Sequence, residues 1–292
     1  MKEKKAYQVI VNIALLYVTL IMILPLVLLF INSITDENTL IANGYSFFPS
    51  KLSLDAYEYI ATNFSTIGRA YGISIIATAT GTFVGLLITS MMAFSLSIRK
   101  LPGTRIISFF VFFTMLFNGG LMPTYVVWTS LGIVDTIWAY ILPFWLSNAF
   151  NIILVRSYFA TSIPEELYES AKMDGAGYFR IFFTMAIPLG KPILVTVGLF
   201  SLLLYWNDWQ NGLYFITDPQ MLSIQALLNK MNQNLQAVLQ NATYSSSGDI
   251  QNLPAVSIRM AIAFVAMLPI LVMYPFLQKH FTSGVMGGAV KG

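Results

Sequence analysis

Residues 161–192, TSIPEELYESAKMDGAGYFRIFFTMAIPLGKP, decide how this chain is organised. They lie between two strongly apolar segments, and outside one polar loop they form the longest run that is neither purely apolar nor a short connector. A run of this kind between apolar segments predicts a structured loop at a membrane surface.

The composition of the chain is that of a membrane protein. Of 292 residues, 57% are hydrophobic and only 10% are charged, which indicates a polytopic membrane protein rather than a soluble globule. The Lys and Arg residues lie in clusters between apolar runs, a pattern typical of topology signals and not of a nucleic-acid-binding surface. With no cysteine and one histidine, disulfides are excluded and we expect no metal site.

Six stretches are long and apolar enough to cross the membrane, since about 30 Å of hydrocarbon takes roughly 20 helical residues. These stretches are about 9–31, 73–98, 106–129, 137–159, 193–216 and 258–277. The sequence therefore predicts an all-α polytopic fold with one transmembrane domain over residues 1–292 and outer loops at 32–72 and 217–256. No small-residue cleavage site follows the first run, so we expect it to be retained as a helix.

The basic residues between the runs predict the orientation. If the N-terminus is cytoplasmic, twelve of the sixteen Lys and Arg residues face the cytoplasm. The four that would lie outside are Lys51, Arg69, Lys230 and Arg259. Cytoplasmic connections carry the excess of basic residues, so we expect both termini and residues 161–192 to be cytoplasmic.

Residues 162–192 are predicted to form an elbow of two helices. Ser162 followed by Glu165 predicts a capping box that starts a helix at about Ile163, and Gly175 suits the left-handed residue that ends one.

A second helix over 176–187 would climb toward the bilayer and be ended or kinked near Pro188 and Pro192. The elbow would lie parallel to the membrane and present four carboxylates to the cytosol, those of Glu165, Glu166, Glu169 and Asp174. The residues alone leave two interpretations, a solvated connector or a docking surface for a cytoplasmic partner.

The most substrate-like stretch inside a predicted span is 205–211, YWNDWQN. On a continuous helix its tryptophans and asparagines would lie on neighbouring faces, and sugars suit indole rings beside amides. The candidates for a substrate path are Trp206, Asn207, Asp208, Trp209 and Asn211, with Asn118 from the third span. The alternatives are an interfacial aromatic belt, amides that bond between helices, and a paired structural role for Asp208.

Glycines mark two further features of the spans. Asn118-Gly119-Gly120, followed by Pro123, predicts either a cavity lining or a simple kink in the third span. Gly81 and Gly85 form a G-x-x-x-G in the second span, which permits close packing against a neighbouring helix.

Residues 169–189 resemble the EAA loop of bacterial ABC importer permeases, whose pattern is Glu-Ala-Ala, two variable residues, Asp-Gly-Ala and later Ile-x-Leu-Pro. This chain has Glu169-Ser170-Ala171, then Asp174-Gly175-Ala176, then Ile187-Pro188-Leu189. It departs from the pattern at Ser170 and in lacking a leucine before Pro188, and the residues found there are small or apolar.

The rest of the chain is similar to the carbohydrate-uptake branch of that superfamily, specifically its maltose-type second permease. Trp206-Asn207-Asp208 matches a WND sequence of the fifth helix, and Gly288-Ala289-Val290-Lys291-Gly292 resembles the tail of that branch. The resemblance covers essentially the whole chain. It implies a type I importer permease in a bacterial cytoplasmic membrane, with a carbohydrate, specifically an oligosaccharide, as substrate.

The resemblance also implies partners. A second permease would complete the path as a heterodimer, two ATPase subunits would each grip one elbow, and an extracytoplasmic binding protein would deliver the sugar. The coupling residues implied are Glu165, Glu169, Ala171, Asp174, Gly175 and Ala176. The chain has no G-x-x-x-x-G-K-[ST] sequence to hold nucleotide phosphates, so we expect no enzyme activity and no cofactor in it, and ATP and Mg in the partner ATPase.

The second outer loop is predicted to hold a helix with one apolar stripe and an amide-rich face. As in the resembled permeases, that face would contact the binding protein, through Asn229, Asn232 and Gln236. A bare lid over the spans is the alternative. The rival functions are an ion-coupled secondary carrier, for which the chain offers Asp208 but no repeat, and a membrane enzyme, for which it supplies no metal cluster and no nucleophile with a base.

Overall fold

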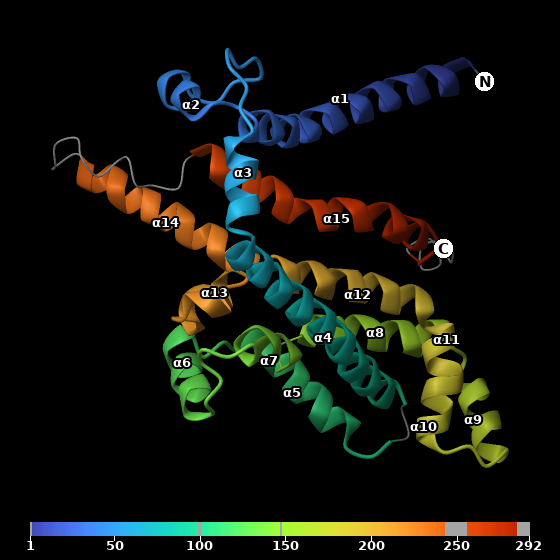
Figure 1. Ribbon diagram of the computed structural model, residues 1–292. Coiled ribbons are helices and arrows are strands. Elements are labelled where there is room, and N and C mark those ends of the chain that lie inside the picture. Colours follow the sequence, from blue (N-terminus) through green and yellow to red (C-terminus); the bar gives the residue numbers. More distant parts are fainter. Residues whose placement is uncertain (1, 99–100, 147, 243–255, 285–292) are drawn as a thin grey trace. The chain divides into compact units, whose positions relative to one another are not determined.

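The computed structural model describes residues 2–98, 101–146, 148–242 and 256–284. Within these ranges it is built from helices, with a single isolated β-bridge between Thr35 and Leu52, as the predicted all-α fold requires (Figure 1). The expected loop tip at 244–248 and the tail from 285 onward lie outside the described residues.

The chain folds as two compact units. Unit 1 comprises Met1–Gly68 and Leu228–Pro269, and unit 2 comprises Arg69–Leu227 and Ile270–Gly292. The prediction of one transmembrane domain over residues 1–292 is not tested by this division and stays a prediction. The helices before residue 99 are α1 (Lys2–Ser33), α2 (Glu37–Asn43), α3 (Asp55–Thr62) and α4 (Phe64–Ser97). Those that follow are α5 (Thr104–Leu116), α6 (Leu121–Ser130), α7 (Trp138–Leu146), α8 (Ala149–Ser162), α9 (Glu165–Met173), α10 (Tyr178–Ile181), the π-helix η1 (Phe182–Ala186), α11 (Ile187–Leu189), α12 (Lys191–Trp206), α13 (Gln210–Phe215), the 3₁₀ turn η2 (Pro219–Met221), α14 (Ile224–Ala242) and α15 (Val256–Gly284).

Three of the described helices contain straight segments long and apolar enough to cross a membrane: Tyr7–Ser33, Phe64–Ser97 and Val256–Met273. Three bent pairs of helices also qualify if each pair is one span. These pairs are Thr104–Leu116 with Leu121–Ser130, Trp138–Trp145 with Ala149–Ser162, and Tyr178–Leu189 with Lys191–Trp206. The described residues therefore offer three to six spans.

The third predicted span is not one helix. α5 and α6 meet at an angle of 117°, so the interpretation of residues 118–120 as a simple kink is wrong. Gly120 has a φ of +86°, which L side chains rarely adopt. The side-chain oxygen of Asn118 accepts a hydrogen bond from the Gly120 N–H at 2.8 Å, an arrangement that offers the backbone an alternative to the helix.

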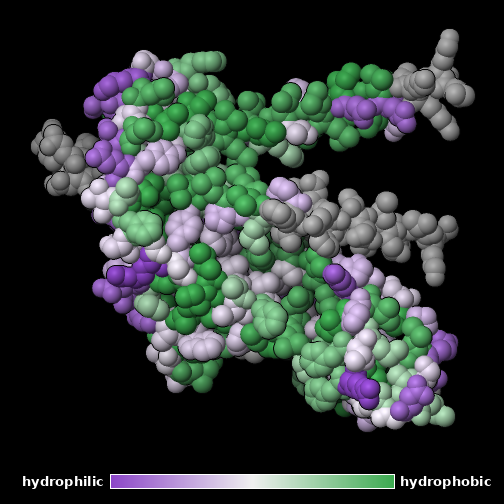
Figure 2. Space-filling model, turned by 45° about the vertical axis from the view of Figure 1, so that its right-hand side comes forward, coloured by the Kyte–Doolittle hydropathy of each residue, from purple (hydrophilic) through white to green (hydrophobic). Residues whose placement is uncertain are grey.

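The outer surface of several helices is apolar, as membrane exposure requires. Within Tyr7–Ser33, none of the most apolar 18-residue window is buried, and Ile10 and Met22 are 66% and 69% exposed. Figure 2 shows hydrophobic residues over much of the visible surface. Apolar exposure on this scale would be unfavourable in water and suits contact with lipid.

Unit 2 holds a buried core where α4 crosses α7 and α12. A Cβ placed on Gly81 of α4 would collide with the ring of Tyr205 from α12. The Gly81 carbonyl accepts a hydrogen bond from the Trp145 indole of α7 at 3.1 Å, and the Tyr205 hydroxyl donates to the Ile141 carbonyl at 3.2 Å. The predicted role of Gly81 in close helix packing is thus confirmed.

Replacing Gly81 with alanine should destabilise unit 2, because the Tyr205 ring is held by its own hydrogen bond and cannot retreat. Overpacking of this kind costs typically about 1–3 kcal/mol. Gly72 of the same helix has nothing within 4 Å of a built Cβ, so Gly72→Ala is the matched control and should be neutral or stabilising by up to about 1 kcal/mol. Thermal midpoints of the purified variants in detergent test this, and equal midpoints would contradict it.

Candidate functional site

The first arm of the elbow is α9, which begins at Glu165. The predicted capping box is wrong, because α8 continues through Ser162 and that side chain makes no cap bond to α9. Ile163 is extended, with φ −112° and ψ 115°, as expected for a residue that precedes proline. Pro164 is the residue before the helix, and the helix starts two residues later than Ile163.

The turn that ends α9 follows the prediction. Gly175 has a φ of +81°, its N–H bonds to the Lys172 carbonyl at 2.9 Å, and the Ala176 N–H bonds to the Ala171 carbonyl at 2.9 Å. These two bonds form a Schellman motif, in which a left-handed residue closes the last turn of a helix. Glu169-Ser170-Ala171 therefore belongs to the last part of α9, and Asp174-Gly175-Ala176 forms the turn that ends this helix.

The predicted coupling residues come together in this elbow and divide into two groups. Glu165, Glu169, Asp174 and Gly175 are exposed. Ala171 and Ala176 are half-buried and pack on the hydrophobic cluster beneath. The acidic groups therefore lie on the outward side, and the two alanines attach the elbow to the protein.

The second arm runs from Tyr178 to Leu189 and includes the π-helix η1. A bend of 83° separates it from α12. Gly190 lies at the bend, where a Cβ would collide with the Phe159 ring and the Ala186 carbonyl. The predicted kink near two prolines is confirmed, and the glycine between them is the residue that the close packing requires.

Lys172 joins the two arms. Its Nζ donates to the Tyr178 hydroxyl at 3.1 Å and lies 4.4 Å from the centre of the Tyr178 ring, a cation–π distance. Sequence reasoning missed this contact. Its signal is the short spacing between a basic and an aromatic residue across a glycine turn.

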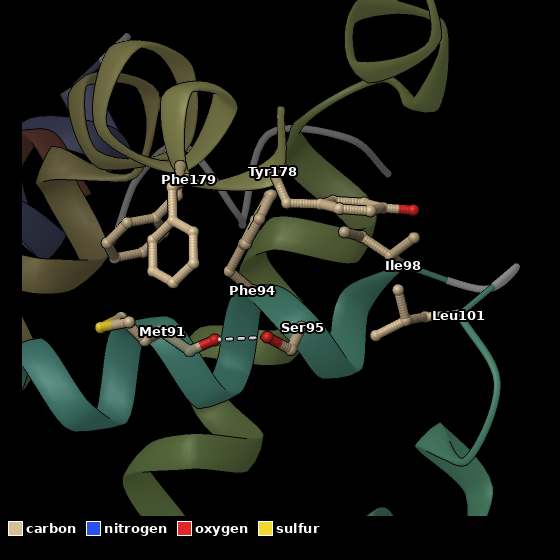
Figure 3. Close-up of a pocket in the computed structure, with 8 residues that line it drawn as sticks. Met91, Phe94, Ser95, Ile98, Leu101, Tyr178 and Phe179 are labelled. Carbon is tan, nitrogen blue, oxygen red and sulfur yellow. Dashed lines mark hydrogen bonds between the residues drawn. The ribbon is translucent and has the colours of Figure 1, made fainter. Parts of the chain in front are cut away.

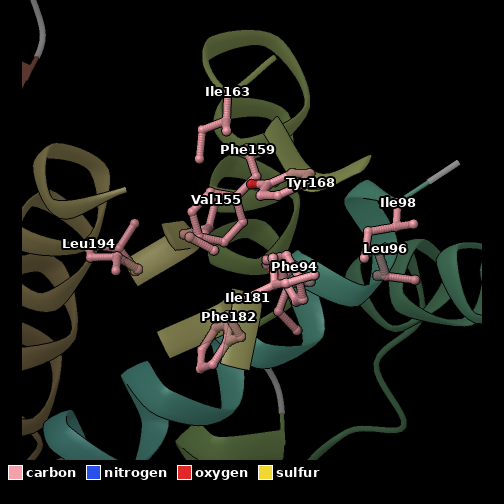
Figure 4. Close-up of a cluster of buried hydrophobic side chains, with 14 of the residues drawn as sticks. Phe94, Leu96, Ile98, Val155, Phe159, Ile163, Tyr168, Ile181, Phe182 and Leu194 are labelled. Carbon is pink, nitrogen blue, oxygen red and sulfur yellow. The ribbon is translucent and has the colours of Figure 1, made fainter. Parts of the chain in front are cut away.

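Phe94 of α4 anchors both arms (Figure 4). The rings of Phe159, Tyr168 and Phe182 surround it at centroid distances of 6.5, 5.6 and 5.5 Å. These rings come from α8, α9 and η1, so one side chain connects a long helix to both arms. Burial raises the pKa of Tyr168 to about 12, and its buried hydroxyl has no hydrogen-bond partner within the described ranges.

An apolar groove lies between the end of α4 and the second arm (Figure 3). Its volume is about 200 Å³. Met91, Phe94, Ile98 and Leu101 form one side, and Tyr178, Phe179 and Phe182 form the other. Phe179 is 69% exposed, so the elbow carries exposed aromatic surface as well as carboxylates.

The predicted substrate stretch is a break between helices and not a helix face. α12 ends at Trp206 and α13 starts at Gln210, so the expectation of one helix over 193–216 is wrong. Asn and Asp side chains compete with helical hydrogen bonds, and here Asp208 accepts from the Asn211 N–H at 3.1 Å and from its Nδ2 at 2.8 Å.

Asp208 belongs to a buried polar joint. It is 6% exposed, and its carbonyl accepts a hydrogen bond from the Ser223 hydroxyl at 3.2 Å. The Ser223 N–H donates to the Tyr140 hydroxyl at 3.0 Å, and the neighbouring Ile224 N–H donates to the Ser74 hydroxyl at 2.9 Å. These contacts favour the structural interpretation of Asp208 and leave its contact with sugar a prediction.

The other candidates for the substrate path differ in how far their side chains are exposed. Trp206 is buried, Asn207 is exposed and Trp209 is 40% exposed. Asn211 is half-buried in α13, whereas Asn118 is exposed and bonds to its own loop. Among the described contacts, none joins Asn118 to residues 206–211.

α14 carries the residues predicted to contact the binding protein. Asn232 and Gln236 are exposed and Asn229 is half-buried, so the amide-rich face is present. The Oδ1 of Asn232 accepts a hydrogen bond from Nη1 of Arg259 at 3.2 Å. Arg259 is a residue of α15, and sequence reasoning did not link it to this face.

Two carboxylates with structural roles were also missed. Glu37 accepts hydrogen bonds from the Val256 N–H at 2.7 Å and the Ser257 N–H at 2.8 Å, which caps the start of α15. Asp135 accepts from the backbone N–H groups of Thr217 and Asp218. The Thr217 hydroxyl also donates to Asp135 and is the largest cause that lowers the pKa of this carboxyl below its usual value, with the two backbone hydrogen bonds as further causes. No local pattern could reveal contacts between residues so distant in sequence.

Comparison with known proteins identifies the family. Residues 85–287 match the family described as "Binding-protein-dependent transport system inner membrane component". Protein LplC of Bacillus subtilis (strain 168) is 39% identical over 274 residues, which are 93% of this chain and 90% of the relative. The polygalacturonan/rhamnogalacturonan transport system permease protein YtcP of the same organism is 37% identical over 292 residues, 99% of this chain and 100% of the relative.

A solved structure agrees with these relatives. It is a bacterial ABC transporter involved in the import of the acidic polysaccharide alginate, and one of its chains is 27% identical with a TM-score of 0.80. The similarity covers 96% of this chain and 98% of that chain. The chain belongs to the family of inner-membrane components of binding-protein-dependent transport systems and is a permease subunit of a carbohydrate ABC importer, a transport component and not an enzyme.

Proposed function

We propose that this chain is a six-span subunit that works as a heterodimer with a second permease, in a bacterial cytoplasmic membrane with both termini in the cytoplasm. Two ATPase subunits bind the elbows, and an extracytoplasmic binding protein delivers an oligosaccharide. The excess of basic residues in the connections assigned to the inside supports this orientation. Three straight helices and three bent pairs that are long and apolar enough to cross a membrane support up to six spans.

The geometry of the elbow is the observation that carries this proposal. Glu165 and Asp174 are exposed on it, and the exposed Phe179 ring lies on its second arm. The turn between the arms is closed by backbone groups. A rigid, charged and partly aromatic protrusion is suited to a cleft on another protein.

The ring cluster around Phe94 supplies the path for motion. When the ATPases close on ATP, displacement of α9 is passed through the Tyr168 ring to Phe94 of α4, and through Phe159 to α8. Packed cores transmit rigid-body motion because they are not continuously deformable. The elbow thus acts as a lever and carries out no chemistry itself, and ATP and Mg belong to the partner ATPase.

The printed names of relatives support an oligosaccharide as the substrate. They include a permease for polygalacturonan and rhamnogalacturonan, one for melibiose, raffinose and stachyose, and one for arabinooligosaccharides. The structural relative imports an acidic polysaccharide. Charged and neutral sugars are both represented, and an oligosaccharide is the class they share.

ATP-driven import can be tested against ion-coupled carriage in vesicles that hold the complete transporter and its binding protein. Labelled oligosaccharide should accumulate when ATP is supplied and should continue to do so after an uncoupler abolishes the ion gradients. Inactivating the partner ATPase should abolish uptake. Accumulation that follows the ion gradient and ignores the ATPase would contradict the proposal.

Gly175→Pro should abolish uptake while the protein still inserts into the membrane. Proline fixes φ near −65°, which the φ of +81° at this position excludes, and it removes the N–H that bonds to Lys172. Gly177 already has a φ of −72° and open space around it, so Gly177→Pro is the matched control and should retain most uptake. Normal uptake by Gly175→Pro at normal membrane levels would sink the lever mechanism.

A further inference from the structure

The apolar groove between α4 and the second arm has two ends of different character (Figure 3). Met91 lies at one end, within the helix Phe64–Ser97 that is long and apolar enough to cross a membrane. Ile98, Leu101 and the hydroxyl of Tyr178 lie at the other end. The last two turns of α4 separate the ends, about 10 Å along the helix axis. The groove therefore leads from a membrane-spanning segment to the connection that follows it.

The wall of the groove is apolar and open on one side. Phe94 and Phe182 are buried in it, whereas Phe179 is 69% exposed. The Ser95 hydroxyl donates to the Met91 carbonyl of its own helix at 3.0 Å, so this polar group is already satisfied. An open apolar surface at the end of a membrane-spanning helix suits a hydrocarbon chain.

Lys172 brings a positive charge to the end of the groove at Ile98. Its Nζ donates to the Tyr178 hydroxyl at 3.1 Å and lies 4.4 Å from the centre of the Tyr178 ring. An ammonium group has three hydrogen-bond donors, and Tyr178 takes one of them. Lys172 is half-buried, so its position is fixed beside the groove and it can bind a further anionic group.

Further basic residues belong to the same end. Arg105 is exposed in the first turn of α5, four residues after Leu101, and Arg180 is exposed directly after Phe179. By sequence alone, the two residues between Ile98 and Leu101 are also basic, Arg and Lys. An apolar groove that ends among basic residues is complementary to a molecule with a hydrocarbon chain and an anionic head.

The acidic residues of α9 belong to a different cavity. The described residues that line the groove include no carboxylate. Glu165 and Glu169 line a neighbouring cavity of about 300 Å³, to which Lys172 also contributes. Lys172 thus stands between the acidic side of the elbow and the groove, and an anion in the groove meets the lysine before it meets a carboxylate.

We propose that the groove binds an anionic phospholipid of the cytoplasmic leaflet, with an acyl chain between α4 and the second arm and the phosphate on Lys172. Basic pockets between membrane-spanning helices on the cytoplasmic side bind anionic headgroups. The inference rests on the proposed orientation, which puts the basic end of the groove at the cytoplasmic surface. The bound lipid braces the second arm against α4, so coupling through the elbow depends on the lipid composition of the membrane.

The test measures lipid binding to the purified complete transporter in a neutral detergent. The probes are phosphatidylglycerol and phosphatidylcholine with the same acyl chains. Native mass spectrometry reports the bound lipid, and the thermal midpoint of the complex reports the stabilisation that binding brings. The wild type should prefer phosphatidylglycerol. Glycerol phosphate, which has no acyl chain, should not displace it.

Two variants address the two ends of the site. Lys172→Gln should weaken binding of phosphatidylglycerol about fivefold, the contribution of one basic residue beside an anionic lipid, and Lys172→Arg should retain it. Ser95→Phe places a ring in the groove from an exposed position and should abolish the preference for phosphatidylglycerol without lowering the midpoint of the lipid-free complex.

Each variant has a matched control. Thr80 is exposed on the same helix as Ser95, and its hydroxyl likewise donates to the carbonyl four residues earlier, so Thr80→Phe should leave lipid binding unchanged. Lys230 is an exposed cation of α14, and Lys230→Gln should also leave it unchanged.

Several outcomes would overturn the lipid site. Unchanged preference for phosphatidylglycerol in Lys172→Gln and Ser95→Phe would place the bound lipid elsewhere. Equal loss of binding in Lys172→Arg and Lys172→Gln would reduce Lys172 to a structural partner of Tyr178. Dissociation of the ATPase subunits from Ser95→Phe, with lipid binding intact, would make the ATPase the occupant of the groove.

The same complex separates this inference from the proposed function. A transporter that imports oligosaccharide with ATP but shows no preference for phosphatidylglycerol contradicts the lipid site alone. A transporter that binds phosphatidylglycerol as described but imports no oligosaccharide with ATP contradicts the proposed function alone.

Discussion

The need to bond every backbone polar group away from water shapes this protein more than any single contact. A helix in lipid satisfies its own N–H and C=O groups, and any break exposes several of them. At three breaks a short polar or acidic side chain binds the exposed N–H groups: Asn118 at Gly120, Asp208 at Asn211, and Glu37 at the start of α15. The few polar residues of this apolar chain thus determine where its helices can bend.

In the elbow, the backbone groups exposed at the turn are satisfied by other backbone groups and not by side chains. Its turn is closed by the N–H groups of Gly175 and Ala176, which bond to backbone carbonyls of α9. Because the backbone closes the turn, the carboxylates of Glu165 and Asp174 are exposed at the surface. Aromatic packing on Phe94 then gives the elbow a stiff attachment, which the proposed lever mechanism requires.

Local patterns predicted the parts of this structure that local forces determine. Hydropathy located the apolar segments, and Gly175 predicted the end of α9 because a left-handed residue is an intrinsic preference of glycine. The predicted capping box is wrong because residues outside the motif decide where the helix begins. Ser162 has the right residue type to start a helix, but α8 runs through it, and the restriction before Pro164 then delays the next helix to Glu165.

The prediction of one continuous helix over the fifth span is wrong for a related reason. The predicted span runs across Asn207 and Asp208, but the hydrogen bonds that Asp208 accepts from Asn211 and Ser223 favour a break there. Contacts such as that between Glu37 and Ser257 join residues 220 positions apart, and no spacing rule in a single sequence can indicate them. The turn that ends α9 was therefore predictable from its residues, whereas the start of α9, the polar joint and the start of α15 required the folded chain.

A carboxylate and a guanidinium lie near the N-terminal end of α15, those of Glu37 and Arg259. The N-terminus of a helix carries a partial positive charge, which stabilises a nearby anion and disfavours a cation. Glu37 is placed as that field demands, with its carboxylate on the Val256 and Ser257 N–H groups. Arg259 is placed against it, buried and with its Nε unsatisfied among the described residues. Arg259 is therefore held in the first turn of α15 against this field, and its hydrogen bond to Asn232 joins that turn to α14.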